Sequence, residues 1–564
     1  MPAAYRVLRA FFIFFPNRVK IGRKKYNQVN KLNSGAVNTR VNWMRAKLLL
    51  GFLVVVIALS CNLPVTRTIN RSKESTQKTL SVEQTLIAEL FPESPQETPA
   101  LSHPQPDLEH TFAGLATAVP GQAAGLPEQG QTDRPWVYIT QPGDTLPALA
   151  KRFGVSQEEI TALETVEGGL LPVGQQLIIP NVLEDTEFYP GALLPDSAVI
   201  YSPSAKDFDI EQYIAEAGGY LSRHVEQVDG KEMSGAEIVR RVAVENSINP
   251  KLLLAVLDYR SGWVHENRSE RRETLYPLGF YAPTHQGLYG ELLLVCRQLT
   301  IAYYGWRDGR VTDLMFNDQT AVRLDPRLNA GSVAVQNLFS KFYPEAQWRE
   351  VLYGEDNFAL YYQSQFGDPW PRAAAVEPLF PEGLQPPDLE LPFLPGENWS
   401  LTGGPHAAWG VGSAWGGVDF APIEAQKGCY VAQSWATAAA SGLVVRSQDG
   451  VVAVDLDGDG YEQTGWVLVY LHIAAAERVP VGQYVHVDDR IGHPSCEGGV
   501  STGTHVHLAR KYNGEWIAAG NALPYVLSGW RVIPGEKPYL GTLVRDGVAV
   551  SARSDGSRSS LITR

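Results

Sequence analysis

Residues 501–508 read Ser-Thr-Gly-Thr-His-Val-His-Leu and place His505 and His507 two positions apart on a predicted strand. Successive side chains of a strand point to opposite faces, so both imidazoles point to the same face. Upstream, a second predicted strand ends at His472, and a third segment, Gly-Gly-Val-Asp-Phe-Ala-Pro, carries Asp419. The histidine pair can therefore place two imidazoles in one pocket.

The β-rich character of this region extends well beyond the histidine pair. Short apolar runs alternate with Gly-rich turns, which predicts a mainly antiparallel β domain over residues 399–530. Six of the eleven histidines of the chain fall in this range: His406, His472, His486, His493, His505 and His507. We expect His486 and His493 to lie at the surface or behind the pocket.

Together these motifs resemble the lysostaphin-like zinc endopeptidases, which cut peptide bonds in peptidoglycan. The resemblance implies that Asp419 and His507 bind zinc and that His472 and His505 are the catalytic histidines. Three protein ligands would leave a fourth position on zinc for water. Zinc lowers the pKa of such a water and polarises the scissile carbonyl.

One ligand of that family is missing from its usual place. The family has a histidine four residues before the aspartate, where this chain has Trp415, and an indole N–H cannot bind zinc. Three interpretations stay open. His406 replaces the ligand; the metal is lost and the groove only binds wall peptide or a partner; or a weak site forms with water or His505 as the extra ligand.

A second candidate metal site is a loop rich in carboxylates. Asp455, Asp457 and Asp459 have the spacing with which a calcium loop opens, but Trp466 stands where a bidentate glutamate is wanted. Calcium binding and a plain polar hairpin loop are the two interpretations.

Two cysteines lie in the same β domain. We expect Cys429 and Cys496 to form a disulfide if the chain is exported to an oxidising compartment, and two buried thiols are the alternative. Cys296, on an apolar predicted helix, is expected to be a core residue.

Residues 136–181 are predicted to form a small β-α-α-β module. They resemble the LysM domain through Tyr138, Pro142-Gly143-Asp144-Thr145-Leu146, Phe153-Gly154-Val155, Gly174-Gln175 and Ile179-Pro180. LysM domains bind glycans that contain N-acetylglucosamine, so the resemblance implies anchoring to peptidoglycan. It places Gly143, Asp144 and Thr145 in the glycan-binding groove. The alternative is a small structural domain.

Helical periodicity predicts an all-α domain over residues 205–365. The segment 248–262 resembles the start of a lysozyme-like transglycosylase domain, in which a glutamate directly before a serine is the catalytic acid. Arg260 stands there, and arginine cannot give up a proton near neutral pH. Asp258 and Glu291 are candidate stand-ins. The favoured interpretation is a degenerate lysozyme-like domain that binds glycan or is structural.

Two proline-rich or polar segments flank the β domain. Residues 366–398 are predicted to be an extended connector because prolines recur throughout it. Residues 531–564 are predicted to form a hairpin and a tail that is disordered past Ser551.

The N-terminal part has the layout of an export signal. Residues 44–61 contain a short basic head, an apolar run and then Cys61, which resembles the lipid-modified cysteine of bacterial lipoproteins. The alternatives are an uncleaved membrane anchor and a cleaved signal with an idle cysteine. Residues 1–43 are a doubtful or disordered extension, and residues 62–134 have the composition of a disordered linker.

The sequence as a whole predicts a multi-domain α+β protein of the cell envelope. A formal net charge of −13 argues against binding nucleic acid. The predicted function is that of a peptidoglycan metalloendopeptidase in wall remodelling, a lipoprotein facing the wall that contacts glycan and stem peptide. It would reach the membrane through a lipid anchor or an N-terminal helix. The alternative is a non-catalytic wall-binding scaffold, or an activator of other hydrolases, with a degenerate zinc site.

Overall fold

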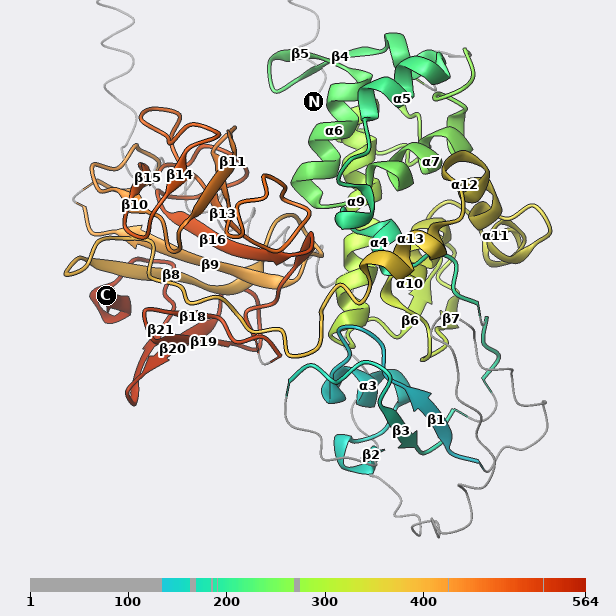
Figure 1. Cartoon of the computed structure of the whole chain (residues 1–564), viewed down its shortest axis with the longest axis horizontal. Coiled ribbons are helices and arrows are strands. Elements are labelled where there is room, and N and C mark those ends of the chain that lie inside the picture. Colours follow the sequence, from blue (N-terminus) through green and yellow to red (C-terminus); the bar gives the residue numbers. More distant parts are fainter. Residues whose placement is uncertain are drawn as a thin grey trace, which may run out of the picture. The chain divides into compact units, whose positions relative to one another are not determined.

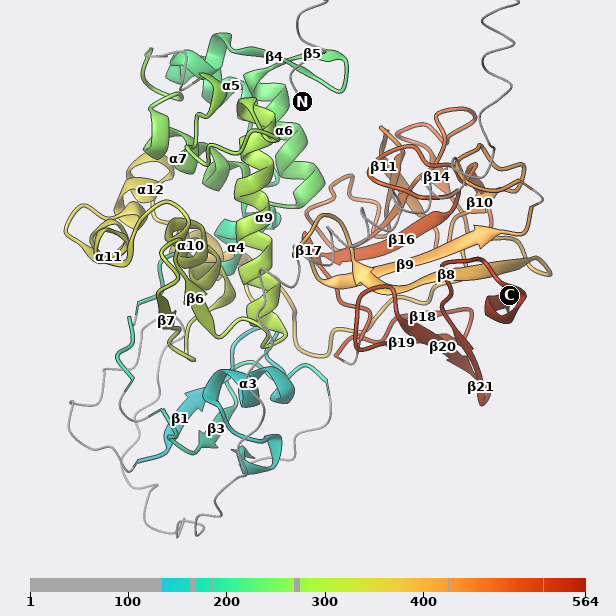
Figure 2. The ribbon, with the colours of Figure 1, turned by 180° about the vertical axis from the view of Figure 1, so that it is seen from behind.

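The computed structural model describes residues 134–162, 169–183, 186–189, 191–267, 274–424, 426–520 and 522–564. The predicted signal segment, Cys61 and nearly all of the predicted linker lie outside these residues. Within them, no helix has the length and apolar character needed to span a bilayer. The described residues form helices and antiparallel sheets, so the chain is a mixed helix and sheet protein (Figures 1 and 2).

The first module is a three-stranded antiparallel sheet with one short helix. Its strands β1 (Trp136–Ile139), β3 (Gln176–Ile179) and β2 (Thr161–Ala162) lie in that order, and helix α3 spans Leu146–Phe153. The second helix of the predicted β-α-α-β module is shorter than a regular α-helix. Among the described residues it is a single 3₁₀ turn, Gln157–Glu159, because the chain extends directly afterwards to pair β2 with β3.

A mainly helical region follows and packs around the long helix α9 (Gly287–Arg307). Helices α6 (Gly235–Asn246) and α10 (Ala330–Ser340) contact α9. The other helices with described bounds in this region are α4 (Asp196–Val199), α5 (Ile210–Ala217), α7 (Pro250–Ser261), α11 (Glu345–Tyr353), α12 (Phe358–Phe366) and α13 (Pro369–Val376). The region also holds two hairpins, β4 (Val225–Val228) with β5 (Lys231–Ser234), and β6 (Asp313–Met315) with β7 (Ala321–Arg323). The prediction of an all-α domain is therefore wrong.

Helix α13 lies inside the segment predicted to be an extended connector. The Asp368 carboxylate accepts a hydrogen bond from the Trp370 backbone N–H and caps the helix. Pro369 and Pro371 stand in the first turn, where a backbone N–H has no partner within the helix anyway. The prolines therefore begin a helix here, and the extended prediction is wrong for these residues.

The C-terminal domain is built on a nine-stranded antiparallel sheet. Its order is β14-β11-β12-β13-β16-β9-β8-β22, and β17 pairs with β16. The strands are β8 (Asn398–Ala407), β9 (Trp415–Pro422), β11 (Gly442–Gln448), β12 (Val451–Asp455), β13 (Trp466–Leu471), β14 (Tyr484–Val485), β16 (Val506–Tyr512), β17 (Glu515–Trp516) and β22 (Leu561–Thr563). The mainly antiparallel β prediction agrees with this sheet.

The central strands of this sheet are buried on both faces. On one face of β13, Val467 and Val469 belong to a core that also contains Tyr303 of α9. On the other face, Leu468 and Tyr470 belong to a second core, formed by the C-terminal domain and the segment 389–393 that precedes it. A strand buried on both faces reads as a continuous apolar run rather than an alternation. The sheet and the helical region thus share one hydrophobic core.

The last part of the chain adds a second sheet and returns to the first. Strands β18 (Val526–Leu527), β19 (Trp530–Pro534), β20 (Gly541–Arg545) and β21 (Val548–Ser551) form a four-stranded antiparallel sheet. Beyond it, β22 pairs with β8, so the prediction of a disordered tail past Ser551 is wrong. The polar composition of the tail does not indicate a strand, because β22 forms only through its pairing with β8, which lies far away in the sequence.

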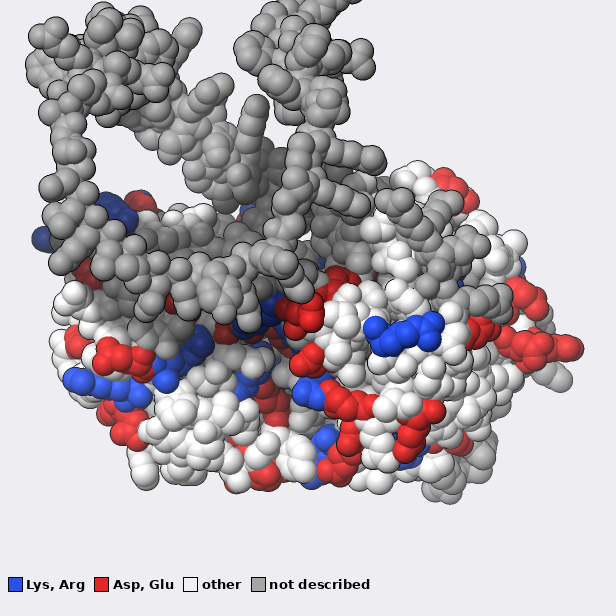
Figure 3. Space-filling model, turned by 90° about the horizontal axis from the view of Figure 1, so that it is seen from above, with Lys and Arg blue, Asp and Glu red and all other residues white. Residues whose placement is uncertain are grey.

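Charged side chains of both signs are interspersed over the described part of the face seen in Figure 3. This part of that face therefore carries no continuous basic surface of the kind that binds a phosphate backbone.

Candidate metal centre

Three neighbouring strands bring His406, Asp419 and His507 together. His507 of β16 lies opposite Asp419 of β9, and His406 lies on β8, the next strand of the sheet. His507 Nδ1 is 3.1 Å from Asp419 Oδ1 and 3.0 Å from His406 Nε2. His406 Nε2 is 3.5 Å from Asp419 Oδ1. All three side chains are buried, and one metal ion could contact all three.

The second ring nitrogen of each of these histidines faces a backbone carbonyl. His406 Nδ1 is 2.8 Å from the Gly404 carbonyl oxygen, and His507 Nε2 is 3.0 Å from that of Ala408. A carbonyl oxygen only accepts hydrogen bonds, so the imidazole nitrogen facing it carries the proton. His406 Nε2 and His507 Nδ1 are then left with lone pairs directed at the Asp419 carboxylate, which is the tautomer that binds a metal.

His472 and His505 lie beside this group. Their rings are 4.5 Å apart between centroids, and His505 Nε2 is 3.6 Å from Asp419 Oδ1. Each again has a backbone partner at Nδ1: the Glu497 carbonyl at 3.0 Å for His472 and the Gly503 carbonyl at 2.7 Å for His505. All four histidines of the site are thus oriented by the backbone through one nitrogen.

The charges of the site are set by burial and by its close neighbours. Burial alone raises the pKa of Asp419, but the imidazoles of His406, His505 and His507 outweigh burial and hold this pKa below its usual range. Burial, followed by the effect of His505 and His507, lowers the pKa of His472 to about 3. Burial also lowers the pKa of His406. At neutral pH the Asp419 carboxylate is therefore ionised and the imidazoles of His406 and His472 are neutral, which for Asp419 and His406 is the state that metal binding requires.

Two glycines make room for the site. A Cβ on Gly417 would lie 2.1 Å from His507 Cε1, and a Cβ on Gly403 would lie 2.3 Å from Asp419 Oδ2. Any side chain at either position would displace a group of the site. Gly417 belongs to the motif that the sequence singled out, but its spatial role becomes visible only in the sheet.

Trp415 does not take part in the site. It begins β9 opposite Ala407, and its ring lies beneath the guanidinium of Arg310, 5.3 Å from the ring centroid. The histidine next to Asp419 comes from the neighbouring strand β8 instead. His406 Nε2 lies 3.5 Å from Asp419 Oδ1 and 3.0 Å from His507 Nδ1, close enough for the three side chains to share one metal ion.

Tyr539 was missed by the sequence interpretation. It lies in the turn between β19 and β20, and its ring stacks on His406 with centroids 4.1 Å apart and an interplanar angle of 21°. Backbone hydrogen bonds join the same two segments, from Gly404 N–H to the Tyr539 carbonyl and from Tyr539 N–H to the Pro405 carbonyl. No local motif marks Tyr539, because the contact arises only when the second sheet folds back on β8.

Cys429 and Cys496 are joined by a disulfide, with Cα atoms 5.5 Å apart. The bond lies next to Glu497, whose carbonyl orients His472. It therefore ties the loop before β10 (Ala436–Thr437) to the segment that supports a catalytic candidate. Cys296 is buried in the core of the helical region.

The carboxylates of Asp455, Asp457 and Asp459 lie close together at the end of β12. Their oxygens accept hydrogen bonds from within the loop: Asp455 from the backbone N–H groups of Asp457 and Gly460, and Asp459 from Thr464. Burial is the main reason that the pKa of Asp455 rises to about 6. These contacts describe a hairpin loop that closes on itself, and nothing beyond the carboxylates supports calcium.

The LysM residues predicted to bind glycan have structural roles. The buried Asp144 carboxylate accepts hydrogen bonds from Tyr138 at 2.6 Å and Arg152 at 2.8 Å, within the module itself. Thr145 caps α3, and Gly143 is buried with a φ of 80°. Asp144 and Gly143 shape the loop of the module. Glycan binding by Gly143, Asp144 and Thr145 stays a prediction.

The candidate acid Glu291, and Arg260 in the usual place of the acid, are also engaged in hydrogen bonds within the helical region. Glu291 accepts four backbone N–H groups, those of Leu278, Gly279, Phe280 and Tyr281. Arg260 donates to the Leu278 carbonyl and to the Tyr343 hydroxyl. Both side chains therefore hold the segment 278–281 in place, and neither is free to act on a substrate.

Two family models match separate parts of the chain. The LysM domain model matches residues 138–180, and the model described as LasA, N-terminal domain, matches residues 192–379. The helical region thus matches the N-terminal domain of LasA, whereas its likeness to lysozyme stays a prediction. Protease LasA of Pseudomonas aeruginosa strain UCBPP-PA14 is 27% identical over 358 residues, which cover 59% of this chain and 77% of that protein.

Two solved structures are also similar. The M23 metalloprotease pseudoalterin from the deep sea is 23% identical with a TM-score of 0.25, over 30% of this chain and 96% of that one. The catalytic domain of lysostaphin from Staphylococcus simulans is 21% identical with a TM-score of 0.16, over 22% of this chain and 88% of that one. The LysM and LasA N-terminal domain models thus match two separate parts of this chain, and 59% of the chain is similar to protease LasA.

Proposed function

We propose that this chain is an exported zinc metalloendopeptidase that cuts peptide bonds of peptidoglycan. The observation that carries the proposal is the convergence of His406 Nε2, Asp419 Oδ1 and His507 Nδ1 on one point. The relatives from Pseudomonas aeruginosa are named as proteases, which supports a peptidase activity for this chain as well.

The donor set fits zinc in chemistry and in spacing. Zinc bonds of about 2.0–2.1 Å in a tetrahedral arrangement put ligand atoms about 3.3–3.4 Å apart. The three donor pairs of the site are 3.0, 3.1 and 3.5 Å apart. Two imidazoles and one carboxylate are a frequent ligand set of catalytic zinc and leave one position open. His406 would be the first ligand, so Trp415 is not needed in that role.

The other two histidines fit the proton transfers of peptide hydrolysis. When bound, zinc would lower the pKa of an attacking water and polarise the scissile carbonyl. His472 and His505 each donate through Nδ1 to a backbone carbonyl, so each presents Nε2 as a proton acceptor. A ring that has taken a proton at Nε2 can then donate it to the leaving amine or stabilise the developing oxyanion.

The rest of the chain would bring this site to the wall. The LysM domain would hold the glycan and keep the peptidase domain near stem peptides. The apolar run 48–60 and Cys61 would direct export and lipid anchoring. The Cys429–Cys496 disulfide fits an oxidising compartment. Incorporation of labelled fatty acid, lost in Cys61→Ser, would test the anchor.

The non-catalytic scaffold is the less favoured alternative. It was based on Trp415 in place of a zinc ligand and on Arg260 in place of the acid of the helical region, and the position of His406 offers another donor for the first of these.

Metal analysis and digestion of purified peptidoglycan test the peptidase proposal. The purified chain should contain one zinc ion and release new amino termini from the wall, and His406→Ala and His507→Ala should lose both properties. His486→Ala is the matched control, because its side chain is 76% exposed and lies outside the site. Equal digestion by wild type and His507→Ala would overturn the proposal.

A further inference from the structure

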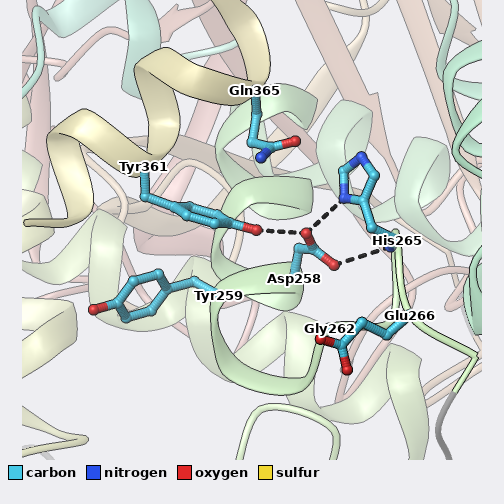
Figure 4. A pocket seen from close by; sticks show the side chains of 7 residues that line it. All are labelled: Asp258, Tyr259, Gly262, His265, Glu266, Tyr361 and Gln365. Atoms are coloured by element: carbon cyan, nitrogen blue, oxygen red, sulfur yellow. Dashed lines mark hydrogen bonds and ion pairs between the residues drawn. The ribbon is translucent and has the colours of Figure 1, made fainter. Parts of the chain in front are cut away.

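A pocket of about 430 Å³ opens in the helical region, away from the candidate metal centre (Figure 4). It lies between the C-terminal end of α7, the loop that follows, and α12. Its lining residues are Asp258, Tyr259, Gly262, His265, Glu266, Tyr361 and Gln365. None of these lining residues belongs to the candidate metal centre.

The buried Asp258 carboxylate at the base of the pocket is fully engaged. One oxygen accepts the backbone N–H groups of Val264 at 2.9 Å and His265 at 3.1 Å. The other is 2.7 Å from His265 Nδ1 and accepts the Tyr361 hydroxyl at 2.5 Å. A carboxylate with four partners has little capacity left for a ligand. A molecule in the pocket would therefore meet the neighbours of Asp258 instead.

Those neighbours offer aromatic faces together with hydrogen-bond donors and acceptors. Figure 4 shows Tyr361, Gln365 and His265 arranged around Asp258. Because His265 Nδ1 faces the carboxylate, its Nε2 is left as an acceptor, and the Tyr361 oxygen can also accept. The Gln365 amide offers both a donor and an acceptor.

The charges of the lining residues argue against an anionic ligand. No lysine or arginine is among the lining residues, while two are acidic, so an anion would be repelled. One Gln365 amide N–H donates to Ser364 Oγ, and an ammonium group, which has only donors, would leave the other amide N–H without an acceptor. Hydroxyl groups both donate and accept, and the apolar face of a sugar ring packs on tyrosine.

We propose that this pocket is a binding subsite for a neutral sugar unit. Binding rather than cleavage is proposed, because the one buried carboxylate is held by four hydrogen bonds and Arg260 on the same helix is engaged elsewhere. That the sugar belongs to wall glycan rests on the proposed function. The subsite would give the chain a glycan contact separate from LysM.

Hydrogen exchange on the full chain, read by mass spectrometry, separates the two glycan contacts. The probe is a soluble oligomer of N-acetylglucosamine. It should slow exchange in peptides that cover 258–266 and 358–366, in addition to any effect within 136–181. Gln365→Ala should raise the oligomer concentration needed to protect the pocket about tenfold, which corresponds to the loss of a ligand hydrogen bond. Tyr361→Phe keeps the ring and should weaken it less.

Gln363→Ala is the matched control, because Gln363 is an exposed glutamine on the same helix. Protection by the sugar confined to residues 136–181 would overturn the subsite, and so would protection of the pocket by a soluble stem peptide alone. His507→Ala should bind the sugar like wild type. If wild type does not digest peptidoglycan but the sugar still protects the pocket, the peptidase proposal is rejected and the subsite stands. If wild type digests peptidoglycan but the sugar does not protect the pocket, the subsite is rejected and the peptidase proposal stands.

Discussion

The imidazole of His406 stacks on the ring of Tyr539, with the two centroids 4.1 Å apart. Under the proposed function, the metal centre depends most on this stacked histidine, because it would supply the donor that Trp415 cannot. The second sheet of the C-terminal domain thus supports a residue of the first sheet.

Replacement of Tyr539 should therefore weaken metal binding without unfolding the chain. We expect Tyr539→Ala to lower zinc affinity about tenfold, as loss of groups that support a metal ligand commonly does. Tyr539→Phe keeps the stacked ring and should bind zinc like wild type. Competition with a coloured chelator measures the affinity, and equal affinities for Ala and wild type would contradict the supporting role.

Gly417→Ala should abolish zinc binding, because the new Cβ would lie 2.1 Å from His507 Cε1. The imidazole would have to turn away from Asp419. Gly410→Ala is the control, since its Cβ would meet its nearest neighbour at an ordinary 3.9 Å. Zinc content and circular dichroism of both variants check the expectation, which fails if Gly417→Ala keeps its metal.

The buried group Arg446, Glu462 and Lys511 should contribute to the acid sensitivity of the C-terminal domain. Glu462 lies 2.6 Å from Arg446 Nε and 2.7 Å from Lys511 Nζ. Breaking a buried ion pair from one side costs about 3–5 kcal/mol, so Glu462→Gln should lower the free energy of unfolding by that order at pH 7. Glu382→Gln, at an exposed position, should change it little.

The pH dependence of the same variant has a definite sign. Burial raises the pKa of Glu462, but Arg446 and Lys511 outweigh burial and lower the pKa to about 2, below the ordinary 4.5. A lowered pKa in the folded state means that the stabilisation is complete above about pH 4.5 and is lost as the pH falls toward 2. Chemical unfolding at several pH values should show wild type and Glu462→Gln converging in acid, and a constant difference would contradict this assignment.

Loss of the Cys429–Cys496 disulfide should affect catalysis more than metal binding. Reduction, or the Cys429→Ser variant, frees the segment whose Glu497 carbonyl orients His472, while the three zinc-binding candidates stay in the sheet. We expect a lower kcat with unchanged zinc content, together with a loss of about 2–4 kcal/mol of stability. Peptide hydrolysis and metal analysis under reducing conditions distinguish these effects.

Local patterns in the sequence predict some parts of the site and not others. The spacing of His505 and His507 places them on one face because the period of a strand is two. Asp419 and His472 follow from family motifs. His406 stayed one of three alternatives, because its place depends on the pairing of β8 with β9, which has a register shift between Gly403 and His406. No local pattern encodes that shift.

Elements held by distant partners were the least predictable. Strand β22 and the stacked Tyr539 exist through contacts with β8, and composition cannot show such contacts. Helix α13 was misread because prolines in a first helical turn look like those of an extended connector.

The two cores on either side of β12 and β13 also determine how these strands can vary. On a strand with one solvent-exposed face, every second residue can be replaced by a polar one with little loss of folding stability. Here Val467 and Leu468, neighbours in the chain, are both fully buried in different cores. A scan of single aspartate substitutions along 467–470 should find no tolerated position, and every such variant should reduce soluble yield.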